Sequence, residues 1–288
     1  MANDFDNTAV NATVKELWDE KVEDARYAKG VILNRVANKS GIASKKGDVI
    51  HVTIDQRYTV GTVGADGAFT PQNYAPTTSD VSLNQWEQIA IRILDRAAAQ
   101  SFWSPDSDFP KDAGAAYAEH YDTVIAGQYA SFNSLSQVGS DTSPTAFGKQ
   151  HMLAAMLRLA DANIPKENLS FFLPPIGFYG GLMNEVQFTA ADQSGQSKNV
   201  LTTGYQFSLL GTPFYLSTTV ALTGTPPVRK GLLLHKQAMA IAFQKNNEIR
   251  RADRTPALVA SYVTIVKSLY GISVIRGDHG VQINIAAS

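Results

Sequence analysis

The sequence predicts an α+β fold, in which helices and strands are mixed and do not alternate regularly along the chain. Three observations support this prediction. Apolar residues recur at every second position near residues 49–60 and 89–93, as in half-buried strands. Apolar residues recur at helical spacing between residues 113 and 135. The last third of the 288-residue chain consists mostly of short runs typical of strands.

The N-terminal segment, residues 12–29, alternates acidic and basic side chains around a few apolar ones. The apolar residues include Leu17, Trp18 and Val22, which helical periodicity brings to one side of the segment. We therefore expect an amphipathic helix that is either mobile or packed against a partner.

The first strand, residues 49–60, is followed by a stretch rich in Gly, Pro and Thr, residues 61–78, and then by the second period-two run. This order predicts a long β-hairpin whose two strands are residues 49–60 and 89–93, with Phe69 and Tyr74 near an extended tip. A two-stranded hairpin has too few internal contacts to be stable alone. We expect it to lie against a neighbouring molecule.

A long helix is expected next. Asp108 is placed as its N-cap and Pro110 in its first turn, since both residue types favour these positions. The apolar repeat from Ala113 to Leu135 predicts an unbroken helix of roughly 26 residues and about 40 Å. Tyrosines on its apolar face favour a half-buried packing surface.

The remainder of the chain is expected to mix short helices with strands. A helix is predicted from Ser143–Pro144 to about Ala162, and a shorter one from Pro174–Pro175 to Leu182. A polar loop is expected at residues 189–199. Strands are predicted at residues 169–173, 211–220, 231–234, 237–243, 258–269, 273–276 and 281–285.

The charge composition argues against sequence-specific DNA binding. The net charge is −1, with 25 basic and 26 acidic residues, and no stretch concentrates Lys and Arg. Charged residues make up 18% of the chain, below the roughly 25% of ordinary domains. Weakly charged surfaces repel one another little, which favours self-association.

Targeting and redox signals are missing from the sequence. Zero cysteines excludes disulfides, thiolate metal sites and cysteine nucleophiles, and it is compatible with a reducing cytoplasm. The first residues are acidic where a secretory signal would be basic. The longest uncharged stretch, residues 199–228, is rich in Thr, Ser, Gly and Pro, so we expect no transmembrane helix.

None of the candidate metal-binding or phosphate-binding motifs has the residues that its chemistry requires at the required spacing. The five histidines are isolated from one another, and His120 falls on the packing stripe of the long helix, where a structural role is expected. Asp106, Asp108 and Asp112 lack the glycine and the bidentate acid of a calcium loop. Gly148-Lys149 lacks the Ser or Thr of a phosphate-binding loop.

Two further patterns favour structural interpretations. Gly61, Gly64 and Gly67 do not form a dinucleotide-binding motif, and Arg276-Gly277-Asp278 is expected to be a turn between strands. We therefore predict no catalytic residues, no cofactor site and no metal site. A pair of carboxylates for hydrolysis stays possible, because such residues can be distant in sequence.

The order of elements and several short stretches carry a family resemblance. The stretches are Leu157-Arg-Leu-Ala-Asp-Ala-Asn-Ile-Pro165, Leu169-Ser-Phe-Phe-Leu-Pro-Pro175, residues 204–217, the run that starts at Gly231, and residues 270–281. Across about residues 45–285 the chain resembles the Hong Kong 97-like major capsid proteins of tailed phages. These positions are patterns of apolar, Gly and Pro residues, and the family shares no catalytic residues that could be transferred.

The resemblance implies a division of the chain into five parts. These are an N-terminal arm (1–47), an extended hairpin loop (48–95), a peripheral domain with a spine helix (96–142), a mixed α/β axial domain (143–245), and closing strands shared by both domains (246–288).

The resemblance also implies function. We expect a virion protein, assembled in the bacterial cytoplasm, whose pentamers and hexamers form an icosahedral shell around double-stranded DNA, touching the DNA only non-specifically. Intersubunit contacts are expected at Leu17, Trp18, Val22, Tyr58, Phe69, Tyr74 and Trp86. Because only about 45 residues precede the first strand, we expect a separate scaffolding protein and no maturation cleavage. A portal is also expected as a partner during assembly.

Some family members crosslink Lys to Asn between subunits. No Lys lies between Lys46 and Lys111, so the hairpin tip offers no donor for that reaction. The alternatives are an encapsulin-like nanocompartment subunit, which shares the fold but encloses protein, a soluble hydrolase, or another virion component such as a decoration or tail-tube protein.

Overall fold

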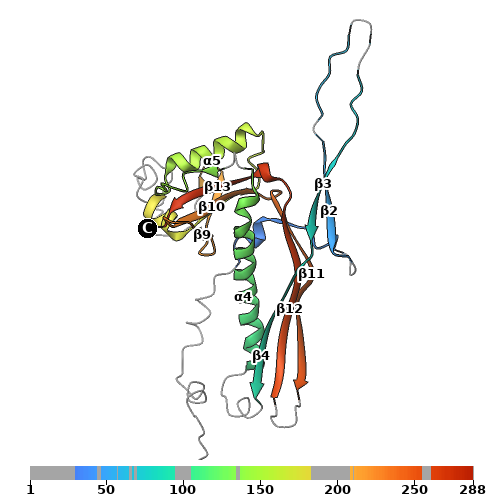
Figure 1. The fold of residues 1–288 in the computed structure, drawn as a ribbon, viewed down its shortest axis with the longest axis vertical. Helices are drawn as coiled ribbons and strands as arrows, with labels where there is room; N and C mark the ends of the chain where they lie inside the picture. Colours follow the sequence, from blue (N-terminus) through green and yellow to red (C-terminus); the bar gives the residue numbers. More distant parts are fainter. Residues whose placement is uncertain are drawn as a thin grey trace, which may run out of the picture.

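The computed structural model describes residues 30–43, 47–56, 58–64, 67, 70–94, 105–133, 137–182, 208–209, 211–254 and 261–287. These residues form an elongated molecule with three parts (Figure 1). We call them the shaft, a long helix beside long strands; the lobe, a second sheet with a shorter helix; and the ribbon, residues 49–82, which projects away from both.

The shaft contains a four-stranded sheet along which a helix lies (Figure 1). Its strand order is β1 (Ala37–Asn38), β11 (Met239–Arg254), β12 (Ser261–Val274) and β4 (Gln85–Leu94). β12 pairs antiparallel with both β11 and β4, and β1 is parallel to β11. The helix α4 (Pro105–Gly127) is fixed to this sheet by Tyr117, whose hydroxyl donates to the Val266 carbonyl at 3.0 Å.

A buried apolar cluster lies between α4 and the sheet of the shaft, and we call it the first core. Tyrosines of α4 form its centre. The Tyr121 ring packs edge-on against Tyr270 and Phe243, with ring centroids 4.9 and 5.2 Å apart. Its hydroxyl donates to Ser268 Oγ at 2.6 Å, and burial raises the pKa of Tyr121 to about 12, which keeps this donor protonated. The expectation of a half-buried surface was wrong here, because Tyr117 and Tyr121 are almost completely buried under the sheet.

The lobe contains the second sheet, which one helix covers. Its strand order is β5 (Gln137–Val138), β13 (Gly280–Ala286), β10 (Val228–His235), β6 (Leu169–Leu173), β8 (Thr212–Leu216) and β7 (Ser208–Leu209). Outside this order, β9 (Leu222–Thr223) pairs with β10. The helix α5 (Lys149–Asp161) lies over one face and buries Met152, Ala155 and Leu159.

Both faces of the second sheet are buried, which explains its continuous apolar runs. Leu233 and Phe171 point into the second core beneath α5, whereas Leu232 and Phe172 point into the first core with α4. A strand that is covered on both sides favours apolar residues at most of its positions. The sequence accordingly loses its period-two alternation in β6 and in most of β10.

The ribbon begins as two antiparallel strands, β2 (Val49–Ile54) and β3 (Thr77–Ser82). Ile50 and Val81 are buried at its base against Ala240 and Ala242 of β11. Close approach of β3 to the shaft requires glycine at position 271, because a Cβ there would overlap the Ser82 carbonyl.

The predicted hairpin pairing was wrong. Residues 49–54 pair with Thr77–Ser82, while the isoleucine run at residues 89–93 belongs to β4 and pairs with β12. The physical reason is burial: Ile89 and Ile91 pack against the first core, which a free two-stranded hairpin could not provide.

Three helix boundaries differ from the predictions. The helix α4 begins at Pro105, so Asp108 lies inside it and is not its N-cap. It ends at Gly127 and is followed by the 3-10 turn η2 (Gln128–Ser131), so it is not unbroken to Leu135. Similarly, α5 begins at Lys149 and not at Ser143–Pro144.

Other predicted elements are confirmed. The strand 169–173 is β6, and Pro174–Pro175 precede the π-helical turn η4 (Ile176–Gly181). The strands predicted at 258–269 and 273–276 are merged in β12. The Arg-Gly-Asp tripeptide leads into the 3-10 turn η6 (Gly277–His279), which connects β12 to β13. The helix expected at 12–29 and the loop expected at 189–199 lie outside the described residues.

One buried carboxylate fixes the first described segment to the shaft. Asp122 of α4 accepts three backbone N–H groups around the 3-10 turn η1 (Leu33–Arg35): Val31 at 2.5 Å, Ile32 at 3.0 Å and Leu33 at 2.8 Å. Burial raises the pKa of Asp122, and these three donors act in the opposite direction.

Candidate functional site

The ribbon beyond β2 and β3 is the most exposed part of the described chain. Glutamine side chains link the segment that follows β2 to the segment that precedes β3. Gln72 Oε1 accepts from the Thr59 N–H at 3.1 Å, and Gln56 Oε1 accepts from the Ala75 N–H at 2.8 Å. These hydrogen bonds hold the two segments together but bury little apolar surface. Tyr58 and Tyr74 are accordingly 59% and 62% exposed, and Val60 and Val63 are exposed as well.

Three of the seven expected contact residues can be located. Tyr58 and Tyr74 lie on the exposed ribbon, and Trp86, 53% exposed, lies at the start of β4 with Lys245 Nζ 5.5 Å from its ring centroid. Leu17, Trp18, Val22 and Phe69 lie outside the described residues. The exposure of the three located side chains leaves them available for contacts with another molecule.

A second exposed apolar surface lies on the lobe. Leu153 and Leu157 project from the outer side of α5, one helical turn apart, and Tyr179 of η4 is also exposed. Sequence reasoning missed this surface. The signal was the second apolar pair in α5, at positions that the buried set Met152, Ala155 and Leu159 does not use.

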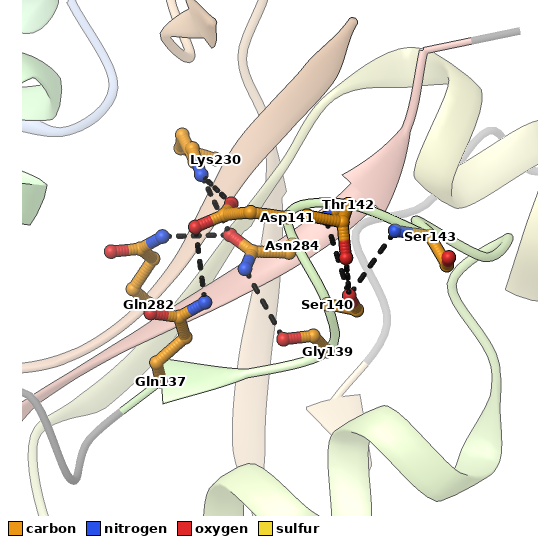
Figure 2. A network of polar contacts seen from close by, with 9 residues as sticks. All are labelled: Gln137, Gly139, Ser140, Asp141, Thr142, Ser143, Lys230, Gln282 and Asn284. Atoms are coloured by element: carbon orange, nitrogen blue, oxygen red, sulfur yellow. Dashed lines mark hydrogen bonds and ion pairs between the residues drawn. The ribbon is translucent and has the colours of Figure 1, made fainter. Parts of the chain in front are cut away.

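A polar network lies on the lobe between β10, β13 and the loop that follows β5 (Figure 2). Lys230 of β10 and Asn284 of β13 are only 4% and 0% exposed, and Gln282 lies two residues before Asn284 on the same strand face. The loop that follows β5 brings Gly139 and Asp141 to the same point.

Each group in the network has a defined partner. Lys230 Nζ forms an ion pair with Asp141 and donates to Asn284 Oδ1 at 3.1 Å. Gln282 Nε2 donates to the same Asn284 oxygen at 2.7 Å, and Asn284 Nδ2 donates to the Gly139 carbonyl at 3.2 Å. The Tyr129 ring centroid lies 5.6 Å from the ammonium group. A cleft of about 530 Å³ opens beside the network.

The network was also missed at the level of sequence. The signal was polar residues at alternate positions of strands that are otherwise apolar, with Lys230 before Gly231-Leu-Leu-Leu234 and Gln282 and Asn284 within Val281-Gln-Ile-Asn-Ile285. A lysine in such a run is expected to be paired if it is buried. Which partners it finds depends on the register of β10 with β13, which the sequence does not specify.

Two lobe histidines favour their neutral forms. His235 Nδ1 accepts the Gln237 N–H at 3.3 Å, and its ring packs edge-on to His279 with centroids 5.5 Å apart. Burial, followed by the nearby His279 and Arg276, lowers the pKa of His235. Burial likewise lowers the pKa of His151, whose Nδ1 faces the Gly148 N–H at 3.4 Å.

His120 connects elements of the shaft. Its Nε2 lies 2.9 Å from Glu87 Oε2 and 3.2 Å from the Tyr270 hydroxyl, so it joins α4 to β4 and β12. The sequence placed His120 on the packing face of the long helix, but its side chain is 44% exposed, so only part of the ring is packed. These contacts give His120 a structural role.

The described ranges contain neither a metal-binding cluster nor a membrane-spanning helix. No three of their His, Asp or Glu side chains come together as a metal ion would require. None of the helices in these ranges has both the length and the apolar character needed to cross a membrane.

This chain resembles known proteins in structure and not in sequence family. A scan against protein-family models and a search of curated proteins gave no match. A structure from Mycobacterium phage Che8 is 22% identical with a TM-score of 0.72, and 98% of each chain is covered. The capsid structure of cyanophage P-SCSP1u is 14% identical with a TM-score of 0.74, covering 97% of this chain and 95% of that one. The chain has the fold of phage capsid structures.

This fold extends over the whole molecule. The capsid asymmetric unit of cyanophage Pam1, 11% identical with a TM-score of 0.67, covers 95% of this chain and 94% of its own. The mixed helices and sheets of the shaft and the lobe therefore belong to one shared architecture.

Proposed function

We propose that this chain is the major capsid protein of a tailed bacteriophage and that its copies form an icosahedral shell around double-stranded DNA. One observation carries the proposal: the structural likeness to phage capsids spans 95–97% of the chain in the comparisons above. On this proposal the protein has a mechanical role in the virion and no enzymatic one.

The finer architecture would be that of the Hong Kong 97-like proteins. The ribbon would lie in the extended loop (48–95) and α4 would be the spine helix of the peripheral domain (96–142). The lobe would contain the axial domain (143–245), with residues 246–288 as closing strands and residues 1–47 as the arm. The separation of ribbon, shaft and lobe in Figure 1 supports this assignment.

The contacts between subunits would use the surfaces that the chain leaves uncovered. Tyr58, Tyr74 and Trp86 would pack on neighbouring copies, as would Leu17, Trp18, Val22 and Phe69. Exposed aromatic side chains are typical anchors of interfaces, because each buries a large area at low entropic cost. Such head-to-tail contacts close into rings, here pentamers and hexamers.

Further partners follow from the same proposal. A separate scaffolding protein and a portal would guide assembly in the bacterial cytoplasm, and the packaged DNA would lie near the inner wall without specific contacts. The net charge of −1 suits such a wall, since a strongly basic surface would bind the phosphates tightly.

Electron microscopy of the purified full chain, alone and with its scaffolding protein, tests the proposal. We expect ring-shaped capsomers or closed shells, and nuclease-protected double-stranded DNA inside particles from the natural source. Particles that enclose protein in place of DNA would instead identify a nanocompartment. A chain that stays monomeric at high concentration, with or without its scaffold, would overturn the capsid assignment.

A further inference from the structure

The outer side of α5 carries an exposed stripe of apolar and charged residues. The inner side of the helix buries Met152, Ala155 and Leu159 against the sheet of the lobe. On the opposite side, Leu153 and Leu157 are 43% and 60% exposed. Figure 1 shows α5 at the outer boundary of the lobe, with the sheet on one side of it. Two exposed leucines one helical turn apart can pack into the grooves of a second helix.

Opposite charges lie at the two ends of this stripe. Lys149 is the first residue of α5 and Asp161 is the last, and both side chains are exposed. Helical geometry, at 3.6 residues per turn, places them on opposite flanks of the leucine pair. The outer side of α5 therefore runs from a cation, across two leucines, to an anion.

Both terminal charges have the sign that the helix dipole disfavours. The N-terminus of a helix favours negative charge and its C-terminus favours positive charge. Lys149 and Asp161 are placed the other way round, and the first turn of α5 has no acidic residue. At the other end, Arg158 in the last turn compensates in part for Asp161. A carboxylate supplied by another molecule would therefore be favourable at the start of α5.

The stripe is complementary to itself. Its residues, at positions 149, 153, 157 and 161, are spaced symmetrically about Ala155. In an antiparallel pair of α5 helices with a two-fold axis at this position, each residue meets the one equally far from the centre on the second helix. Leu153 would then meet Leu157, and Lys149 would meet Asp161, each of them twice. Each Asp161 would also lie at the N-terminus of the opposite helix, where a negative charge is favoured.

We propose that two copies of this chain pair through α5, antiparallel and around a two-fold axis. The leucines form the centre of the contact, and the two Lys149–Asp161 pairs fix its direction. A parallel pair would instead bring like charges to the same height. Such a two-fold contact is complete at two copies, whereas rings require head-to-tail contacts. The α5 pair is therefore separate from the ring contacts of the proposed function and does not depend on them.

Sedimentation of the full chain tests the proposal. The chain would carry Y58S and Y74S, so that contacts of the ribbon do not obscure the α5 pair. One helix face about 20 Å long is smaller than a standard interface, so we expect a reversible dimer with a dissociation constant of roughly 10–300 µM. L157A should weaken it by at least about 10-fold, because the dimer loses two leucine contacts. A chain that stays monomeric at about 1 mM, well above this range, would overturn the proposal.

Charge reversal tests the direction of the pair. K149E places a carboxylate against Asp161 of the second copy, and D161K places an amine against its Lys149. Each change should weaken the dimer by about 10-fold, and K149E with D161K should restore it to within about 3-fold. Both changes suit the helix dipole, so a lost dimer would not reflect an unfolded α5. The matched control K236E reverses an exposed lobe lysine outside α5 and should leave the dimer unchanged. Failure of the double variant to restore the dimer would refute the antiparallel arrangement.

Crosslinking gives an independent test of the same arrangement. The full sequence contains no cysteine, so a single introduced cysteine reacts without background. With a short bismaleimide reagent, K149C chains mixed with D161C chains should give mixed dimers in excess over dimers of either chain alone. An excess of K149C joined to K149C would indicate parallel helices and overturn the proposal. Shells that form without an α5 dimer would contradict this inference alone, and an α5 dimer without shells would contradict the proposed function alone.

Discussion

The lobe and the ribbon differ in how much of their own surface they bury. All residues of β6, and all of β13 but the last, are buried, whereas the six residues of β2 include one buried side chain, that of Ile50. The lobe has a helix on one face of its sheet and the first core on the other. The ribbon has the shaft at its base and nothing from the described chain along its tip (Figure 1).

This difference separates two tasks within one chain. Buried apolar area stabilises the fold of a single subunit at about 25 cal/mol per Å². Uncovered aromatic side chains add nothing to that fold and become useful only when another molecule covers them. Substitutions in the lobe should therefore act on the stability of the subunit, and substitutions on the ribbon should act on assembly.

The largest effect is expected at the centre of the lobe. Phe172 of β6 is fully buried and stacks on Tyr215 with centroids 5.6 Å apart. F172A should lower the free energy of unfolding by about 3–5 kcal/mol, through lost burial and a residual cavity. Chemical denaturation of the full chain measures this. L157A, at an exposed position of the same lobe, should cost less than about 0.5 kcal/mol. Similar losses in the two variants would show that burial does not set the cost of a substitution in the lobe.

The two cores show what could be predicted from sequence. Helical spacing identified the tyrosines of α4, and apolar runs identified β6 and β13, because each pattern is local. The helix start could not be chosen, since Pro105 and Pro110 are both compatible with a first turn. The partner of the first ribbon strand was wrong, because the choice between residues 77–82 and 89–93 depends on the distant strand β12 and on α4.

The candidate site was less accessible to prediction than the fold. The exposed ribbon aromatics follow from a stretch rich in Gly, Pro and Thr that has no apolar face of its own. The Lys230 network depends on the register of two strands 54 residues apart and on a loop that follows β5. These are long-range features for which sequence periodicity carries no information.

The next largest effect is expected at the attachment of residues 31–33 to the shaft. D122A would leave three backbone N–H groups without their acceptor, at a cost of about 2–4 kcal/mol. Amide hydrogen exchange at these three residues should accelerate in the same variant. D122N keeps one oxygen, which can still accept from Ile32 and Leu33. Its free energy of unfolding should lie between those of the unchanged chain and D122A. Unchanged exchange in D122A would show that the packing of Ile32 alone holds this segment.

A smaller effect is expected from pH in the lobe. The pKa of His235 is lowered in the folded chain from its ordinary value of 6.5. At a pH just below 6.5 the unfolded chain therefore binds a proton that the folded chain does not bind. Stability should therefore fall as pH decreases through about 6.5 and level off below the folded pKa. H235Q should reduce this slope in thermal unfolding between pH 7 and 5. Q237A keeps the backbone donor to His235 and should preserve the slope. An equal slope in H235Q would assign the dependence to other groups.

The smallest effect on the subunit is expected on the ribbon, where the largest effect on assembly is expected. Tyr58 and Tyr74 make few contacts with the described chain, so Y58S with Y74S should change the free energy of unfolding by less than about 0.5 kcal/mol. Each tyrosine that a neighbour covers would lose a contact worth about 1–2 kcal/mol or more in assembly. Because every subunit in a closed shell loses the same contacts, these losses add up, and the shell yield by electron microscopy should fall sharply.

The matched control T59S changes a neighbouring ribbon residue but keeps its hydroxyl, which accepts from Gln72, and should assemble normally. Normal shells from the tyrosine variant would show that the ribbon tip lies free in the assembly, and the division of tasks between lobe and ribbon would then be wrong.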